Sequence, residues 1–333
     1  HILILPVVFF FVLFLPALLG LSWAPEITNK VMRFYTQSFL VAVTPFFILS
    51  SSEELGEFLK TTVFLGVLFT LEVISAMVVT KGAIWKITAF GSSVIAIGRL
   101  VGVATVYLGL KIMNERTRYW HLLLFMAMIL VLFASGQRMA MFGPILAIFA
   151  TELLVHGLRA KHIIRGVVFI LIAIIVITSV YAFLPTRSRE RVDRMFVMGI
   201  AGFADQGRGS LLFRSLDEAV SQPIGIGLGG AQKRLGIQYP HNIIVETFLE
   251  GGWLAGLALI AMLTSAMIKG YLLMKRRCAV YVYAFGFLVY TVMYAMVAGD
   301  INDNRLVFAM MGIFLRQTFT PSVECKRQTS RTF

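Results

Sequence analysis

The chain has 333 residues, of which 58% are hydrophobic and only 14% are charged, and its formal net charge at pH 7 is +13. A soluble domain has about a quarter of its residues charged, so this composition indicates a protein that lies in lipid. In such a protein, positive charge is typical of cytoplasmic loops rather than of a nucleic-acid surface. The chain contains two cysteines, which excludes a disulfide framework. It opens inside an apolar run without an initiator methionine, so we expect that its N-terminus has been trimmed.

Long apolar segments recur along most of the chain, and a bilayer-spanning helix needs about 20 mostly apolar residues. Together they predict an all-helical, polytopic membrane bundle of about ten or more spans. If the long loop after residue 184 lies outside, most Lys and Arg residues of the remaining loops lie inside, so we expect both termini in the cytoplasm. The candidate spans lie near residues 2–21, 32–50, 60–80, 88–110, 119–135, 139–156, 163–184, 242–268, 278–298 and 304–320.

Residues 185–240 are neither a span nor a short loop. Apolar residues recur at helical spacing between Leu211 and Val220, Ser210 precedes them as a candidate cap, and Pro223 follows. We therefore expect a small, partly helical periplasmic cap in this segment. The other expected segments are an N-terminal transmembrane bundle (1–184), C-terminal transmembrane spans (241–320) and a cytoplasmic tail (321–333).

The cap ends in "QPIGIGLGGAQ", which contains the pattern G-x-G-x-x-G at Gly225, Gly227 and Gly230. A dinucleotide-binding site needs a strand before this pattern and a helix after it within a βαβ unit. Here an amphipathic helix precedes the glycines and a membrane span follows, which excludes that site. Two interpretations stay open: a tight turn that brings backbone close to a helix or to the membrane surface, or backbone N–H groups that approach a phosphate.

His241, in "YPHN", lies where the cap meets the span that begins near Asn242. The N-terminus of a helix disfavours an imidazolium, so this imidazole should stay neutral and able to accept a proton. His241 is therefore our candidate general base. The alternative is a histidine at the membrane interface that only caps the span.

Three arginines on the expected outer face are candidates for binding a diphosphate, which a guanidinium binds through two parallel hydrogen bonds. Arg138 stands at the outer mouth of a span, and Arg208 and Arg214 flank the start of the cap helix. The alternative is that they contact lipid headgroups.

The outer loops predict no metal site and no cofactor. They lack a compact set of carboxylate and histidine ligands, and "GDINDNR" lacks the glycine of a calcium loop. We expect Asp300 and Asp303 of that segment to cap the last span, with substrate binding as the alternative. Within the spans, Glu72 and Arg99 are predicted to form a structural ion pair rather than an ion pathway, because charges buried in a membrane are usually paired.

The stretch "GRGSLLFRSLDEAVSQPIGIGLGGAQ…YPHNIIVETFLEGGW" resembles the core of the O-antigen ligase and polymerase family of bacterial membrane enzymes. A glycine that is frequent in the family three residues after Gly252 is Ala255 here. "GQRMAMFGP" around Arg138 resembles an upstream arginine element of the family, and "GDINDNR" resembles its closing outer loop. The matching core positions are Arg208, Pro223, Gly225, Gly227, His241, Asn242 and Gly252.

The resemblance implies a GT-C-like fold in the bacterial inner membrane, with the active site facing the periplasm. It implies that a glycan is moved from undecaprenyl diphosphate to a second glycan, to lipid A core or, in some members, to protein. Direct displacement of the diphosphate by the acceptor would invert the anomeric configuration, and the arginines can bind the leaving diphosphate without a metal. His241 would be the base, and Arg138, Arg208 and Arg214 would bind the diphosphate. The further implied substrate-binding positions are Gly225, Gly227, Asn242, Asp300 and Arg305.

The implied partners are the lipid-linked donor, the acceptor and membrane lipids, without nucleic acid. Ligase and polymerase use the same donor and stay open as alternatives. A transporter or flippase of lipid-linked anionic glycans is another; it would work without His241 and depend on Glu72 and Arg99. A third alternative is a non-catalytic membrane scaffold, in which the arginines of the cap are dispensable.

Overall fold

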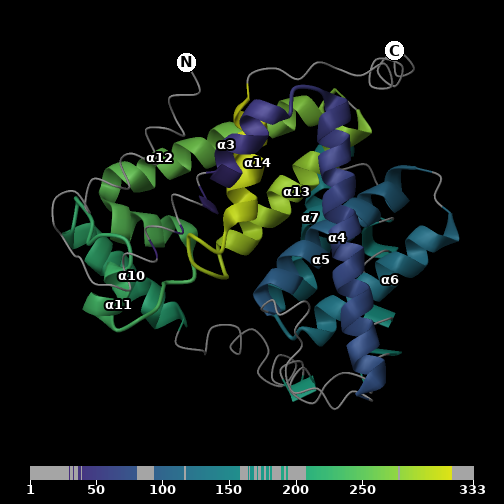
Figure 1. The fold of residues 1–333 in the computed structure, drawn as a ribbon, viewed down its shortest axis with the longest axis horizontal. Coiled ribbons are helices and arrows are strands. Elements are labelled where there is room, and N and C mark those ends of the chain that lie inside the picture. Colours follow the sequence, from purple (N-terminus) through teal and green to yellow (C-terminus); the bar gives the residue numbers. More distant parts are fainter. Residues whose placement is uncertain are drawn as a thin grey trace. The chain divides into compact units, whose positions relative to one another are not determined.

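The computed structural model describes residues 40–80, 94–115, 118–157, 208–276 and 278–316, together with isolated positions outside these ranges, Lys30 among them. Within this part of the chain the regular elements are all helices (Figure 1), which confirms the expected all-α class. They are α3 (Leu40–Ile48), α4 (Ser52–Val79), α5 (Val94–Asn114), α6 (Tyr119–Ala134), α7 (Arg138–His156), α10 (Arg208–Ser221), α11 (Gly230–Leu235), α12 (Ile243–Met274), α13 (Ala279–Ala295) and α14 (Arg305–Leu315).

Four of the described helices, α4, α5, α7 and α12, are long and apolar enough to cross a membrane. The helices α6, α13 and α14 are apolar but shorter. A membrane protein is thus supported, and the expected total of ten or more spans stays a prediction. The expected spans at 2–21 and 163–184, the first part of the cap and the tail at 321–333 lie outside the described ranges.

Contacts divide the chain into two units, and neither is continuous in sequence. The first unit comprises residues 1–51, 203–270 and 291–320, and the second comprises residues 52–202, 271–290 and 321–333. All the candidate site residues except Arg138 belong to the first unit.

In the second unit, α5 packs against α4, α6 and α7. The Tyr290 hydroxyl of α13 donates a hydrogen bond to the carbonyl of Gly98 at 2.8 Å. Gly102 makes room for this tyrosine, because a Cβ at that position would lie 2.0 Å from the Tyr290 oxygen. Glu72 in α4 and Arg99 in α5 are both half-buried, and the ion pair expected between them stays a prediction.

In the first unit, α3 packs against α14. Gly312 allows the close approach of these two helices, since a Cβ there would lie 1.9 Å from the carbonyl oxygen of Ala42. The helix α12 passes the end of α14, where the Lys269 ammonium donates to the carbonyl of Leu315 at 3.1 Å. The same unit contains the residues of the candidate site other than Arg138.

Candidate functional site

The candidate site is built around the beginning of α12, where Asn242 is the capping residue. Its side-chain oxygen accepts hydrogen bonds from the backbone amides of Ile244 at 3.0 Å and Val245 at 3.1 Å. These amides have no partner inside the helix, so the cap satisfies donors that would otherwise be lost. The Asn242 amide group also donates to the carbonyl of Met296 at 3.2 Å, which ties the start of α12 to the segment that follows α13.

His241 directly precedes this cap and has a left-handed backbone conformation, with φ at +61°. Among the described residues it is the one non-glycine residue with positive φ. That conformation costs about 1–2 kcal/mol for a residue with a Cβ. The imidazole is half-buried and meets the Tyr239 ring edge-on, with the ring centroids 4.5 Å apart. Asn242, and not His241, caps the helix. Capping therefore does not explain the strained backbone conformation of His241.

The helix α12 is broken at Gly252, whose φ of 79° and ψ of −178° form a combination that is essentially restricted to glycine. The residues Pro223–Gly227 of the glycine turn lie along this break. The amides of Ile226 and Gly227 donate to the carbonyls of Leu249 and Glu250, each at 2.9 Å. In return, the Trp253 amide donates to the carbonyl of Pro223 at 2.9 Å. The turn and the break therefore form one hydrogen-bonded structure.

Glycine is required on both sides of this contact. Gly225 has φ at +87°, and a Cβ on it would lie 2.4 Å from the backbone nitrogen of Gly252. A Cβ on Gly252 would lie 2.5 Å from the carbonyl carbon of Ile224. The geometry matches the interpretation of a tight turn that brings backbone close to a helix. The Gly225 amide donates to Gln222 and the Gly227 amide donates to Glu250, so both are engaged within the chain. Their implied role in substrate binding stays a prediction.

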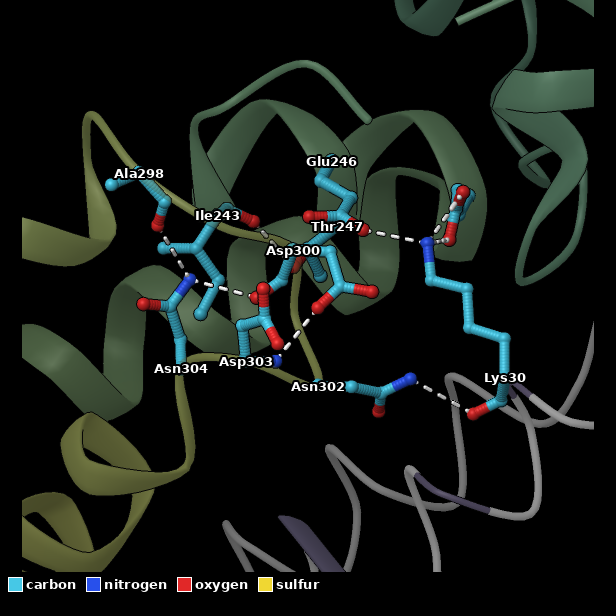
Figure 2. Close-up of polar contacts among 10 residues, drawn as sticks. Lys30, Ile243, Glu246, Thr247, Ala298, Asp300, Asn302, Asp303 and Asn304 are labelled. Atoms are coloured by element: carbon cyan, nitrogen blue, oxygen red, sulfur yellow. Dashed lines mark hydrogen bonds and ion pairs between the residues drawn. The ribbon is translucent and has the colours of Figure 1, made fainter. Parts of the chain in front are cut away.

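A buried ion cluster lies one turn into α12 (Figure 2). The Lys30 ammonium lies 2.6 Å from a carboxylate oxygen of Glu246 and 2.8 Å from one of Glu250. Both glutamates are almost fully buried, and the Lys30 side chain is 12% exposed. Burial lowers the pKa of Lys30, but the two carboxylates outweigh it and hold the pKa well above its ordinary value. The second oxygen of Glu246 is buried and has no hydrogen-bond partner.

The closing loop, residues 299–305, is fixed to this cluster and to itself (Figure 2). The Asn302 amide group donates to the carbonyl of Lys30 at 3.0 Å. Asp300 accepts the backbone amide of Asp303 at 2.7 Å, and its carbonyl accepts the side chain of Asn304 at 2.8 Å. Asp300 thus caps the turn before α14, while Asn304 occupies the residue before the helix without a capping side-chain bond. Substrate binding by Asp300 stays a prediction.

The candidate arginines are spread over several elements. Arg214 is exposed on α10, and Arg305 is the exposed first residue of α14, with its Nε donating to the carbonyl of Asn302 at 3.1 Å. Arg208 is the first residue of α10, and its side chain lies outside the described part of the structure. Arg138 is the half-buried first residue of α7 in the second unit. The helix α10 starts at Arg208, two residues before the Ser210 cap that the sequence suggests.

Sequence reasoning missed the importance of Lys30, Glu246 and Glu250. One local signal was present: the two glutamates are four residues apart in a helix, which places both on one face. Lys30 is more than 200 residues away in sequence, and no local pattern joins it to them.

In the described residues, no group of three His, Cys, Asp or Glu side chains is placed to hold a metal ion. The groups at the candidate site that could take part in chemistry or binding are therefore a histidine, arginines and a buried ion cluster.

No protein-family model matches this chain, and no curated protein matches it.

Proposed function

We propose that this chain is an inverting, metal-independent glycan transferase of the bacterial inner membrane, with a GT-C-like bundle of about ten or more spans. It takes a glycan from undecaprenyl diphosphate at the periplasmic face and transfers it to lipid A core or to a second glycan. The observation that supports this proposal best is the conformation of His241. Backbone strain of this kind is concentrated at functional sites, where the surrounding structure fixes it.

In the proposed reaction, a hydroxyl oxygen of the acceptor attacks the anomeric carbon of the donor glycan. The bond from that carbon to the diphosphate breaks, and its electron pair leaves with the diphosphate. His241 takes the proton of the hydroxyl, as a general base does. Attack opposite to the leaving group inverts the anomeric configuration.

Negative charge grows on the diphosphate as it leaves, so cations are needed beside it. Arg138, Arg208 and Arg214 supply that charge in this proposal, and the forked geometry of the guanidinium suits phosphate oxygens. Asn242, Asp300, Arg305, Gly225 and Gly227 are proposed to bind the remainder of the substrates. The arginines take the place of a metal, so transfer should continue in excess EDTA.

The test is transfer by the purified chain in vesicles that contain the lipid-linked donor and an acceptor. His241→Gln keeps a hydrogen-bonding side chain but cannot take the proton, so it should lower the transfer rate by about 10² to 10⁴. Donor binding should be largely retained. His121→Gln is the matched control and should transfer at the normal rate, because His121 lies at an end of α6 that is expected to be cytoplasmic. Near-normal transfer by His241→Gln would contradict the base role.

Deletion of the gene separates ligase from polymerase. Gel analysis of surface glycans should show unattached polymer on its lipid carrier if the chain is a ligase, and single repeat units if it is a polymerase. If the chain is instead a transporter of lipid-linked glycans, export should survive loss of His241 and fail on loss of Glu72 or Arg99.

A further inference from the structure

The helix α10 has three distinct sides, and each has its own composition. Ser215 and Ala219 are buried against the first unit, and Ala219 belongs to a small core with Ile226 and Leu249. A second side is polar and contains Ser210, Arg214, Asp217 and Glu218. The third side is apolar but exposed. It consists of Phe213 (67% exposed), Leu216 (43%) and Val220 (61%), which we call the outer stripe.

The outer stripe requires an explanation, because the helix already has one side buried in protein and one side suited to water. Three large apolar side chains at positions i, i+3 and i+7 form a continuous line along one side of a helix. Ile224, in the turn that follows the helix, is also exposed, at 54%. Such a line is typical of a helix that lies on a membrane with this side in contact with the lipid chains.

The depth of α10 follows from its contacts with Trp253. The Trp253 indole N–H donates to the carbonyl of Ala219 at 3.0 Å, and its amide donates to the carbonyl of Pro223 at 2.9 Å. Trp253 is the first residue after the break in α12. The helix from Trp253 to Met274 measures about 33 Å at 1.5 Å per residue, which matches a hydrocarbon core of about 30 Å. If this part of α12 spans the membrane, Trp253 lies at the surface of the bilayer, where tryptophan is enriched in membrane proteins.

The lipid-facing side of α12 begins at the same level. Leu254 is 60% exposed, Leu257 is 58% exposed, and Ile268 continues this side further along the helix at 55%. The exposed Ile224 directly follows Pro223, whose carbonyl holds the Trp253 amide. If α12 spans the membrane, α10 and the turn after it are therefore hydrogen-bonded to the residue at which the lipid-facing side of α12 begins.

We propose that α10 lies flat in the outer surface of the bilayer and buries the outer stripe among lipid acyl chains. The helix has 14 residues, about 21 Å at 1.5 Å per residue, which is too short to cross the membrane. Only a flat orientation buries the whole stripe and leaves Arg214 and Asp217 in water. The partner is the phospholipid bilayer itself, and the inference does not depend on the proposed glycan chemistry.

The experiment measures which quencher reaches each side of α10 in the full chain. An environment-sensitive fluorescent amino acid replaces Phe213, Val220 or Arg214, one position at a time, which leaves both cysteines in place. Each variant is reconstituted in vesicles of phosphatidylethanolamine and phosphatidylglycerol. One quencher is a phospholipid with a nitroxide on its acyl chain, and the other is iodide, present on both sides of the membrane. Arg214 is the matched control, because it lies on the polar side of the same helix.

We expect the lipid quencher to reduce fluorescence at positions 213 and 220 severalfold more than at position 214, and iodide to show the reverse order. Equal iodide quenching at all three positions would place the stripe in water and overturn the proposal. Protection of positions 213 and 220 from both quenchers would place them against protein, such as a second copy of this chain, and would also overturn it. Melting curves of the labelled chains show that the fold is retained, and the two stripe positions provide independent readings.

Discussion

At the scale of single residues, His241 combines strain with a candidate chemical role, and the two can be separated by substitution. Glycine adopts positive φ without cost, so His241→Gly should stabilise the chain by about 1 kcal/mol relative to His241→Ala. Both variants should lose transfer, because both lack the imidazole. Melting temperatures of the purified variants check this. Equal stability of the Gly and Ala variants would show that the left-handed conformation carries no strain.

Lys30 is the residue whose loss should harm the fold most. Lys30→Met would leave Glu246 and Glu250 buried beside each other without a cation, and breaking a buried ion pair from one side costs about 3–5 kcal/mol. Lys60→Met is the matched control, since Lys60 pairs with Glu57 on the surface and exposed pairs contribute little. The melting temperature should fall strongly for Lys30→Met and hardly change for Lys60→Met.

The pKa of Lys30 determines the pH at which this comparison is informative. The folded pKa is raised above the ordinary lysine value of about 10.4. A raised pKa means that the stabilisation is fully present below the unfolded value and is lost only as the pH rises through the folded value. A measurement at neutral pH therefore lies well below the pH at which Lys30 loses its proton. Equal melting temperatures of Lys30→Met and the unaltered chain at neutral pH would contradict the ion cluster.

At the scale of elements, the break in α12 depends on two glycines that are distant in sequence. Gly225→Ala and Gly252→Ala would each drive a Cβ into backbone atoms and force a positive φ on alanine, so each should lower the melting temperature strongly. Gly209→Ala is the control, since a Cβ there meets nothing within 4 Å and lies in a helix. It should stabilise α10 by about 0.5–1 kcal/mol. Tolerance of alanine at both 225 and 252 would mean that the break is not a feature of the native chain.

The positions of helices were predicted well from sequence where the apolar pattern of one segment is sufficient to define the helix. The expected spans at 119–135, 139–156 and 278–298 correspond closely to α6, α7 and α13. The Gly252 break was not predicted, because the apolar pattern runs through it from Ile243 to Met274. The break is caused by backbone hydrogen bonds with the Pro223–Gly227 turn. Hydrogen bonds between segments that are distant in sequence produce no periodic pattern of apolar residues in either segment.

At the scale of the whole molecule, the orientation in the membrane can be tested with two added cysteines. Gln232 is exposed on α11 and is expected outside, whereas Arg276 is exposed after α12 and is expected inside. A membrane-impermeant thiol reagent should modify Gln232→Cys in intact spheroplasts and Arg276→Cys only after permeabilisation. The unaltered chain, which has neither added cysteine, provides the background signal. The opposite pattern would reverse the topology and remove the periplasmic location from the proposed function.

The sequence indicates a division into a bundle, a cap and further spans, whereas contacts group the chain into two discontinuous units. Sequence patterns report where a segment prefers to lie, and they do not report which distant segment it contacts. Lys30 shows the difference, since no pattern in the sequence connects it to α12, whereas the structure joins it to two glutamates of that helix. For the same reason, His241 and Asn242 could be singled out from a local motif and the ion cluster beside them could not.

The pairing of the glycine turn with the break also bears on how the chain is assembled. The ribosome makes Pro223–Gly227 before α12, so the donor amides of the turn exist before the carbonyls of Leu249 and Glu250 have been made. Buried backbone carbonyls must find donors, and the carbonyls of the buried residues Leu249 and Glu250 find theirs in the amides of Ile226 and Gly227. Without the turn, an unbroken helix would supply these carbonyls with donors from the following residues of α12. We therefore expect that a chain lacking the turn would keep α12 straight.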